Sequence, residues 1–334
     1  MQVVRRLDEN RWRDFVNNHP QGSIFHTPEM YEVFTHTKGY CPELWATIGP
    51  DGNLLALFLP VYISIINGLL RRLTTRAVAY GSILYVPGIE GQEAVSRLLQ
   101  SYNRVVGVRL LFTELRNVMD LSALQPVLNE RGYLYENHLN FLIDLSRPLP
   151  ELWKNIRTNA RRNIQKAMKS GVEIEELSDP QSLPTIYALL KEVYKYLQVP
   201  LPDLSLFLQA VQILYPEGML KILAAKVNGN YIGALTLLLY KGVVTYWYTG
   251  SPREYSSFRA SDLLVWSALE IGQKNGFQIF DFGGGGKPEE EYGVRDFKAK
   301  YGGDLVNYGR NVFVHSPTKL KLSRAGYQLM RRIL

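Results

Sequence analysis

The segment that most constrains the fold is a short apolar strand that runs into four consecutive glycines. The strand ends in Phe280-Asp281-Phe282, and 283–286 follow it directly. A run of glycines leaves the main chain uncovered by side chains, so another group can approach the backbone closely. Asp296-Phe297-Lys298 comes soon after and supplies a cation behind an aromatic ring. The pattern predicts a strand edge that substrate can approach, with ionisable groups nearby.

Length and composition narrow the class of protein. A chain of 334 residues predicts two domains, and a hydrophobic content of 46% is typical of a globular protein. The formal charge of +7 favours anionic partners such as phosphates, tRNA or an anionic membrane surface. The net charge of +7 is explained equally well if it serves only to keep the protein soluble.

The cysteine and histidine content, the first residues and the apolar stretches argue against a disulfide, a metal site, a signal peptide and a membrane span. The single cysteine, Cys41, rules out an intrachain disulfide, and the five histidines lack metal-ligand spacing, so no metal is expected. The N-terminus lacks the apolar core of a signal peptide. The apolar stretch 54–70 contains Pro60 and Asn67-Gly68, which predict a hairpin rather than a membrane span. A cytoplasmic protein is expected.

Apolar periodicity predicts mixed helices and strands in both halves of the chain. In the first half, helices are expected over 28–34, 92–103 and 121–130, and extended segments over 44–48, 78–85, 108–115 and 132–145. The second half is expected to open with a helix over 151–170 that ends at Gly171, followed by helices over 183–197 and 203–214. Strands over 220–227, 231–240 and 243–249, a helix over 258–274, and strands over 277–282 and 304–315 complete the pattern. The shared order of elements in the two halves indicates a structural duplication.

The second half resembles the second domain of Fem-type (FemAB-like) transferases and the related Fem-like acetyltransferases of the GNAT superfamily. The resemblance rests on five motifs: Trp153…Arg157…Ala160-Arg161-Arg162-Asn163-Ile164-Gln165-Lys166-Ala167, Tyr246-Trp247-Tyr248-Thr249-Gly250-Ser251, Leu263-Leu264-Val265-Trp266…Glu270, Phe280-Asp281-Phe282-Gly283-Gly284 and Phe297-Lys298…Gly302. The first half is similar more weakly, through the segment 21–28. The resemblance implies an α+β protein of two tandem GNAT-like domains with mixed sheets flanked by helices. The expected boundaries are 1–144, 145–315 and a basic amphipathic tail over 316–334.

The resemblance also implies an enzyme of the acyltransferase class. Fem transferases add amino acids from aminoacyl-tRNA to the peptides of peptidoglycan precursors, so cell-wall biogenesis is the expected role. Members that act on nucleotide-linked muramyl peptides hold the diphosphate with a lysine and an arginine. The corresponding stretches here, 29–34 and 199–207, contain no basic residue. The acceptor is therefore left open.

Candidate catalytic residues follow from the motifs. Lys298 falls on the lysine of the family's Phe-Lys motif, and Phe297 precedes it. Its charge is expected to neutralise an oxyanion or assist proton transfer, or else Lys298 is a surface lysine beside Lys300. Asp281 ends its strand and is expected either to orient a substrate amine or to bind the amides of the glycine loop. Tyr246 and Tyr248 alternate on one strand and are expected to share a face, with Tyr248 donating to substrate or both packing in the core.

Candidate binding residues are basic or lie at a helix start. Ser257 is expected to cap the helix over 258–274. Arg259 and the free N–H groups there are expected to attract the donor's phosphates, or else this is an ordinary capped helix with Arg259 solvated. Arg157 and Arg161 lie on a basic helix that is expected to hold the phosphates of tRNA or of a lipid-linked precursor, or else to be a solvated face. The basic tail predicts docking on the protein body or peripheral contact with the inner face of a membrane.

Three functions remain open from the sequence. The first is transfer of an aminoacyl group from aminoacyl-tRNA to an amine of a cell-wall precursor peptide, with no further cofactor. The second is a GNAT-type N-acyltransferase that uses acyl-CoA and acts on a sugar amine or small-molecule amine. The third is a non-catalytic protein of the GNAT fold that binds polyanions. The glycine-containing pyrophosphate loop usual in the superfamily is not evident over 251–260, which weakens the second.

Overall fold

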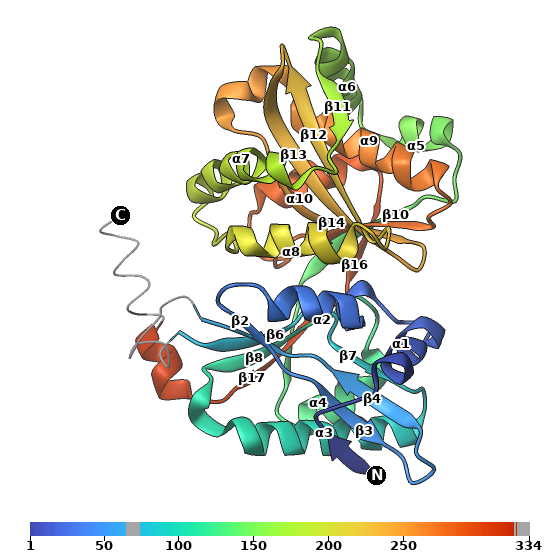
Figure 1. Cartoon of the computed structure of the whole chain (residues 1–334), viewed down its shortest axis with the longest axis vertical. Coiled ribbons are helices and arrows are strands. Elements are labelled where there is room, and N and C mark those ends of the chain that lie inside the picture. Colours follow the sequence, from blue (N-terminus) through green and yellow to red (C-terminus); the bar gives the residue numbers. More distant parts are fainter. Residues whose placement is uncertain (65–73, 324, 326–334) are drawn as a thin grey trace. The chain divides into compact units, whose positions relative to one another are not determined.

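The computed structural model describes residues 1–64, 74–323 and 325 of the chain, and the hairpin expected at Asn67-Gly68 lies outside them. The backbone forms two compact units (Figure 1). The first combines Met1–Asn137 with Tyr308–Leu334, and the second is His138–Asn307. Both units combine sheets with helices, which confirms the predicted α+β class with two tandem units.

The described part of the first unit contains two sheets. Its helices are α1 (Glu9–Asn18), α2 (Pro28–Thr35), α3 (Ile89–Val106) and α4 (Gln125–Glu130). Its strands are β1 (Gln2–Val4), β2 (Tyr40–Pro42), β3 (Trp45–Ile48), β4 (Leu54–Phe58), β5 (Val61–Ile63), β6 (Arg76–Ala79), β7 (Ile83–Tyr85), β8 (Phe112–Arg116), β9 (Leu134–Glu136) and β17 (Arg310–Val314). One sheet has the order β1-β3-β4-β7, and the other has the order β2-β5-β6-β8-β17-β9.

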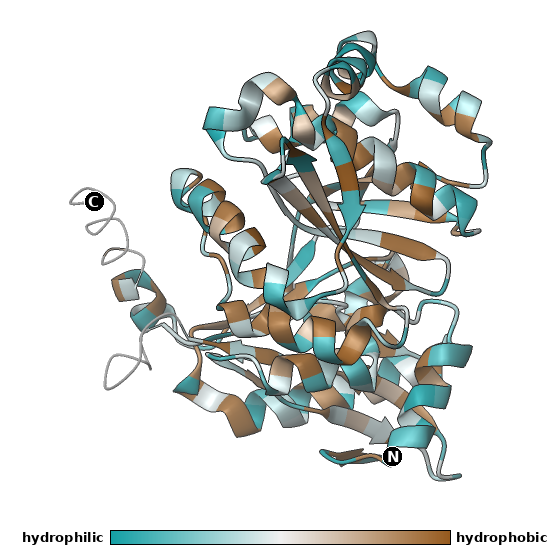
Figure 2. Ribbon diagram, turned by 45° about the horizontal axis from the view of Figure 1, so that its top comes forward, coloured by the Kyte–Doolittle hydropathy of each residue, from teal (hydrophilic) through white to brown (hydrophobic). Residues whose placement is uncertain are grey.

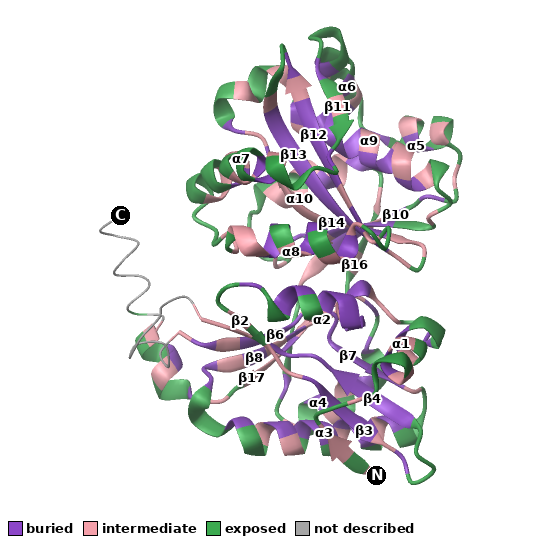
Figure 3. Ribbon diagram, viewed as in Figure 1, coloured by how far each residue is buried: buried purple, intermediate pink, exposed green. Residues whose placement is uncertain are grey.

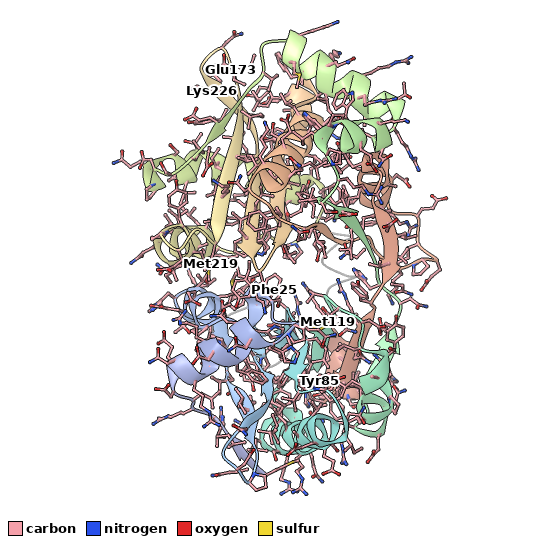
Figure 4. All side chains as sticks on the ribbon, turned by 90° about the vertical axis from the view of Figure 1, so that its right-hand side faces the viewer. Phe25, Tyr85, Met119, Glu173, Met219 and Lys226 are labelled. Carbon is pink, nitrogen blue, oxygen red and sulfur yellow. The ribbon has the colours of Figure 1, made fainter. Side chains whose placement is uncertain are left out.

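Helix α3 supplies much of the core of the first unit. Its apolar residues recur at helical spacing, and its larger fully buried side chains are Val95, Leu98, Leu99 and Tyr102. Burial of each such side chain contributes about 1.5–3 kcal/mol, so this face holds the helix on strands β3 and β4. The helix begins after Gly88 and ends at Gly107, which both have positive φ. Tyr85 and Met119, labelled in Figure 4, join the same core cluster.

The second unit is built on one seven-stranded sheet. Its strands are β10 (Leu139–Asp144), β11 (Glu173–Glu176), β12 (Leu220–Val227), β13 (Asn230–Tyr240), β14 (Val243–Gly250), β15 (Ile279–Gly284) and β16 (Asp304–Asn307), in the order β11-β12-β13-β14-β15-β10-β16. Its helices are α5 (Leu149–Asn155), α6 (Thr158–Lys169), α7 (Leu183–Tyr196), α8 (Leu204–Leu214), α9 (Ala260–Lys274) and α10 (Gly293–Lys298). Glu173 and Lys226, labelled in Figure 4, face each other in the β11–β12 pair.

The sheet of the second unit opens between two of its strands. The three strands predicted over 220–249 form the antiparallel meander β12-β13-β14, which confirms that part of the pattern. Apolar residues follow these strands in Figure 2, and β12 and β13 are buried along most of their length in Figure 3. Strand β15 runs parallel to β14, but only Val243–Thr245 pair with Ile279–Asp281. From Tyr246 and Phe282 onward the two strands continue without pairing to each other.

Three segments that the sequence predicts as single strands are each divided between two sheets. The segments 78–85, 132–145 and 304–315 become β6 and β7, β9 and β10, and β16 and β17. The backbone turns through positive φ between two of these pairs, at Ser82 (64°) and at Gly309 (67°). The apolar pattern does not predict the breaks because it continues on both sides of each turn.

One strand of the first unit comes from the carboxyl-terminal part of the chain. Strand β17 follows the whole second unit in the chain, yet it pairs with β8 and β9 of the first unit. Strand β10 directly follows β9, yet it pairs with β15 and β16 of the second unit. The expected boundaries at 144 and 315 therefore differ from the observed ones at 137 and 307. The first unit is therefore discontinuous in sequence, whereas the second is continuous.

The helix expected over 151–170 is two helices. Helix α5 ends at Asn155 and α6 begins at Thr158, because Ile156 and Arg157 have extended backbone angles. Gly171, with φ of 73°, follows the C-cap of α6, so this end agrees with the prediction. In the expected tail, residues 317–323 are helical, and most of the rest lies outside the described residues.

Candidate functional site

Lys298, the last residue of α10, lies at the glycine run with its side chain buried and the residue only 5% exposed. Its Nζ donates hydrogen bonds of 2.6 Å to the carbonyl oxygen of Phe282 and 2.9 Å to that of Gly284. The carbonyl oxygen of Gly283 lies 3.3 Å away. These carbonyls belong to β15 where it has separated from β14. The ammonium therefore supplies hydrogen bonds to these carbonyl oxygens, which a neighbouring strand would otherwise supply.

Asp281 is a buried acidic group whose charge acts on this ammonium. It is 7% exposed, and its Oδ1 accepts hydrogen bonds of 2.7 Å from Asn140 Nδ2 and 2.7 Å from the Gly283 N–H. Of the two expected roles, the bond to a loop amide is therefore present. Because Gly283 has φ of 67°, the loop turns sharply here and brings its amide back to the carboxylate.

Burial shifts the pKa of both groups toward the neutral form. It raises the pKa of Asp281, while hydrogen bonds from Asn140 and Gly283 and the charge of Lys298 oppose the shift. It lowers the pKa of Lys298 to about 8, and the charge of Asp281 opposes that shift. Lys298 is thus mainly an ammonium at neutral pH. Two buried, oppositely perturbed ionisable groups in contact with open backbone are typical of a functional site.

Tyr246 belongs to this site, but Tyr248 does not. Leu237 of β13 pairs with Tyr246 of β14, and the preceding residue Thr236 pairs with Tyr248. Trp247 has no partner on β13 and therefore forms a β-bulge. Leu237 and Thr236 are consecutive and point to opposite faces, so the expectation that the two tyrosines share a face is wrong. The Tyr246 ring lies 5.5 Å from Lys298 Nζ, and burial raises the pKa of its phenol.

Tyr248 lies in an aromatic cluster on the other side of β14. Its ring is 5.1 Å from that of Phe207 and 6.0 Å from that of Tyr194. These neighbours come from α8 and α7. The contacts fit the core-packing alternative for Tyr248 rather than the substrate-donor alternative.

Phe297 supports the site through a buried network. Its ring packs on Tyr301 at 5.4 Å, and Tyr301 donates a hydrogen bond of 3.0 Å to Oδ1 of Asp262 in α9. Asn163 of α6 donates one of 3.2 Å to Oδ2. Burial raises the pKa of Asp262, and hydrogen bonds oppose the shift. The network ties α6 and α9 to the segment that carries Lys298.

The turn before α9 differs from the prediction. Ser257 is exposed in a 3₁₀ helix, η6 (Arg253–Phe258), and it does not cap α9. The N-cap position is Arg259, which is in the left-handed region (φ 58°) and makes no side-chain cap. Arg259 is exposed, and both Arg259 and Lys300 interact electrostatically with Asp262. A basic surface therefore surrounds the start of α9.

Arg157 and Arg161 lie at the start of α6. Arg157 is exposed, and its backbone N–H donates a hydrogen bond of 2.8 Å to the carbonyl oxygen of Lys300. Arg161 is half-buried, and its Nη2 lies 3.4 Å from Thr158 Oγ1. Farther along, Arg162, Lys166 and Lys169 form an exposed stripe at spacing i, i+4, i+7. Within the described residues these five cations have no ion-pair partner.

Three residues of the site were not predicted from the sequence: Asn140, Asp262 and Tyr301. Asn140 is a polar residue in the middle of an apolar strand, and Asp262 is an acid at the start of an apolar helix. Such isolated polar residues are buried only with hydrogen-bond partners, which was the available signal. Nothing comparable distinguishes Tyr301 from other aromatic residues of the chain.

The part of the chain that the structure describes has no helix of the length and apolarity needed to cross a membrane. The same residues contain no group of three or more His, Cys, Asp or Glu side chains placed to hold a metal ion.

Residues 154–298 match the family model described as "Acetyltransferase (GNAT) domain", which is less than half of the chain. This match confirms the predicted acyltransferase class for the second unit. It includes Lys298 and every other expected site residue of that unit. No curated protein matches the sequence.

Solved structures resemble the whole chain. FemX is 15% identical with a TM-score of 0.71, and the alignment covers 98% of this chain and 99% of that one. A tandem GNAT protein from the clavulanic acid biosynthesis pathway is 12% identical with a TM-score of 0.61, over 95% and 99%. L-PGS from Bacillus licheniformis is 11% identical with a TM-score of 0.60, over 97% and 98%. At such identities the likeness confirms the predicted Fem-like tandem GNAT fold.

Proposed function

We propose that the protein transfers an aminoacyl group from aminoacyl-tRNA to an amine of a cell-wall precursor peptide. The observation that carries the proposal is the buried contact of Lys298 with the open backbone of β15, next to Asp281. In a GNAT-type sheet the opening between two parallel strands is where a donor can lie against the main chain. The Phe-Lys motif and the fold likeness to FemX support the aminoacyl version of this transfer.

The reaction joins the acceptor amine to the carbonyl carbon of the donor ester. The amine nitrogen forms the new C–N bond, the ester C–O bond breaks, and the proton lost by the nitrogen goes to the departing tRNA hydroxyl. Negative charge develops on the carbonyl oxygen during the attack. We assign Lys298 the task of stabilising that charge electrostatically, because its ammonium is held rigidly by two short hydrogen bonds. Asp281 keeps this ammonium charged and oriented.

The basic residues around α6 and the start of α9 are suited to the phosphates of tRNA. Arg157, Arg259 and Lys300 gather around one network, and the exposed stripe of α6 continues the positive charge along the surface. Arginine and lysine side chains at the surface are the usual contacts to a nucleic-acid backbone, and the stripe of α6 has no acidic partner among the described residues. This arrangement favours a polyanionic donor. The protein would then work in the cytoplasm, where charged tRNA is found, with peripheral membrane contact if the precursor is lipid-linked.

The transfer can be tested directly with the purified chain. Charged tRNA and muramyl peptides that end in lysine or alanine are incubated with the protein. The masses of the peptides are then measured by mass spectrometry. We expect a mass gain of one aminoacyl residue. Lys298→Ala should abolish the gain, while Lys195→Ala, an exposed lysine of α7, should leave it unchanged.

The second candidate is N-acylation with acyl-CoA, and the family match to an acetyltransferase domain favours it. The segment before α9 argues against it, because η6 contains no glycine and forms a 3₁₀ helix where the superfamily has its pyrophosphate loop. Acetyl-CoA replaces charged tRNA in a parallel incubation. A mass gain with acetyl-CoA and none with charged tRNA would move the assignment to this candidate. No gain with either donor would leave the non-catalytic, polyanion-binding role.

A further inference from the structure

The Tyr301 ring packs between two residues that frame the hydrogen bond of Lys298. It is 1% exposed, and its centre lies 5.6 Å from that of Phe282 and 5.4 Å from that of Phe297. Phe282 supplies the carbonyl oxygen that accepts the 2.6 Å bond from Lys298 Nζ, and Phe297 directly precedes Lys298 in α10. One ring therefore contacts both the residue that carries the acceptor and the residue before the donor.

The hydroxyl of Tyr301 fixes the place of this ring. It donates a hydrogen bond of 3.0 Å to Oδ1 of Asp262, which is 6% exposed in the first turn of α9. Asn163 of α6 donates one of 3.2 Å to the other carboxylate oxygen. Packing alone does not account for the hydroxyl, because phenylalanine fills nearly the same volume and a buried phenol is costly without a hydrogen-bond partner. The bond to Asp262 therefore holds the ring more strictly than apolar contact would.

The backbone on both sides of Tyr301 adds a second constraint. The carbonyl oxygen of Lys300, which precedes it, accepts a hydrogen bond of 2.8 Å from the N–H of Arg157. Gly302, which follows it, lies against Asn155, the last residue of α5. Both neighbours of Tyr301 thus contact the segment that joins α5 to α6, so the chain at Tyr301 has little freedom to shift.

We propose that Tyr301 and Asp262 are positioning residues for Lys298. The hydrogen bond between them fixes the Tyr301 ring, and the ring in turn sets the distance from Lys298 Nζ to the carbonyl oxygen of Phe282. Both residues act through Phe282 and Phe297 rather than by touching a reacting atom. Their effect on transfer rests on the proposed function, whereas their effect on the ammonium does not.

The position of the ammonium can be measured without any substrate. The full chain with isotope-labelled lysine is studied by NMR at pH 6, where Lys298 is charged, and its Nζ signal is assigned by its loss in Lys298→Arg. Tyr301→Phe and Asp262→Ala should both displace this signal and speed proton exchange at Nζ about tenfold, which corresponds to one weakened hydrogen bond. Asp262→Asn keeps an oxygen that can accept from Tyr301, so its signal should stay near that of the wild type.

The matched control is a buried tyrosine of the first unit. Tyr133 is fully buried, and its hydroxyl donates a hydrogen bond of 2.9 Å to Oδ1 of Asn103. Tyr133→Phe therefore removes a comparable bond and should leave the Lys298 signal unchanged. An unmoved signal in Tyr301→Phe and Asp262→Ala, or an equal displacement in Tyr133→Phe, would overturn the positioning role.

Transfer kinetics separate the positioning role from the proposed function. Tyr301→Phe should lower kcat about tenfold with KM unchanged, because a displaced ammonium stabilises the transition state less and leaves substrate binding as it was. Asp262→Asn should keep most of the activity that Asp262→Ala loses. A displaced Lys298 signal with unchanged kcat would overturn the role in transfer. Displaced signals in both variants, without any transfer by the wild type, would sink the proposed function and leave the positioning of the ammonium standing.

Discussion

Asn140 Nδ2 donates a hydrogen bond of 2.7 Å to Oδ1 of Asp281, the carboxylate whose charge acts on Lys298. The donor is on β10, a strand expected from the sequence to belong to the first domain. The bond favours the ionised carboxylate, because it opposes the rise that burial causes in the pKa of Asp281.

Asn140→Ala should therefore weaken both stability and activity. Removing the donor leaves a buried carboxylate with one hydrogen bond fewer, which costs about 1–3 kcal/mol in the free energy of unfolding. Urea denaturation at pH 7 measures the loss. Asn18→Ala, at the exposed end of α1, is the control and should change stability by less than about 0.5 kcal/mol. If both substitutions lower the free energy of unfolding equally, the hydrogen bond between Asn140 and Asp281 does not stabilise the fold.

The proton of Lys298 should appear in the pH dependence of transfer. Its pKa of about 8 predicts that the rate falls as pH rises through 8, because the ammonium is the working form. A pH–rate profile on wild type measures this, and Lys298→Arg, which stays charged, should not show the fall in whatever activity remains. A wild-type rate that stays level up to pH 9.5 would contradict the assignment.

Lys298 should also change stability at alkaline pH. Its pKa in the folded protein is about 8, below the 10.5 of an unperturbed lysine, so between these values the unfolded chain binds the proton and the folded protein does not. Stability relative to Lys298→Met should therefore rise from pH 8 to 10.5, by up to about 3 kcal/mol. Guanidinium denaturation of both proteins at pH 7.5 and 10 tests the sign. If the stability of the wild type relative to Lys298→Met falls between these two pH values, the pKa of Lys298 is not lowered in the folded protein.

Two histidines of the first unit, the buried His26 and the half-buried His315, should make it sensitive to mild acid. Burial lowers the pKa of His26 to about 3 and that of His315 to about 4. Both values lie below the 6.5 of the unfolded chain, so stability is present above pH 6.5 and is lost as pH falls below it. Each neutral histidine adds about 1.4 kcal/mol of loss per pH unit. His315→Gln should reduce the loss between pH 6.5 and 4.5, whereas His36→Gln, at an exposed position, should not.

Gly302 should tolerate no side chain. Its φ is 77°, and a Cβ there would lie 2.7 Å from the carbonyl oxygen of Asn155. Gly276 has φ of 76° with nothing within 4 Å, so Gly276→Ala reports backbone strain alone. Gly302→Ala should lower the free energy of unfolding by about 1–3 kcal/mol more than Gly276→Ala. If both variants lose the same amount, the contact with Asn155 relaxes at no cost.

The place of β10 between β15 and β16 predicts which fragment of the second unit folds. The fragment 138–307 contains β10, whereas 145–315 lacks it and leaves the facing edges of β15 and β16 unpaired. The first should melt cooperatively in circular dichroism and the second should not. Comparable cooperative melting of both fragments would show that β10 is dispensable.

The sequence predicted local elements well wherever periodicity and end signals agreed. The meander over 220–249 was confirmed because its apolar strands are separated by short turns. Helix α6 ended as expected because Gly171 takes the left-handed conformation that ends helices. The joint between α5 and α6 was not predicted, because Ile156 and Arg157 fit a helical pattern as well as an extended one.

The site was less predictable than the fold because it depends on contacts distant in sequence. Lys298 and Asp281 could be named from motifs, but Asn140 comes from a strand 141 residues earlier than Asp281. The bulge at Trp247 reverses the face of Tyr248, and no residue type in that strand announces a bulge. Arg259, rather than Ser257, is at the N-cap position of α9 because η6 delays the start of the helix.

The place of β17 in the chain has a consequence for synthesis on the ribosome. The sheet of the first unit has an empty position between β8 and β9 until residues 310–314 emerge, after every strand of the second unit has been made. The six-stranded sheet of the first unit therefore stays incomplete while the second unit is translated. A nascent chain stalled before residue 310 should expose unpaired strand edges and be a ready client for chaperones.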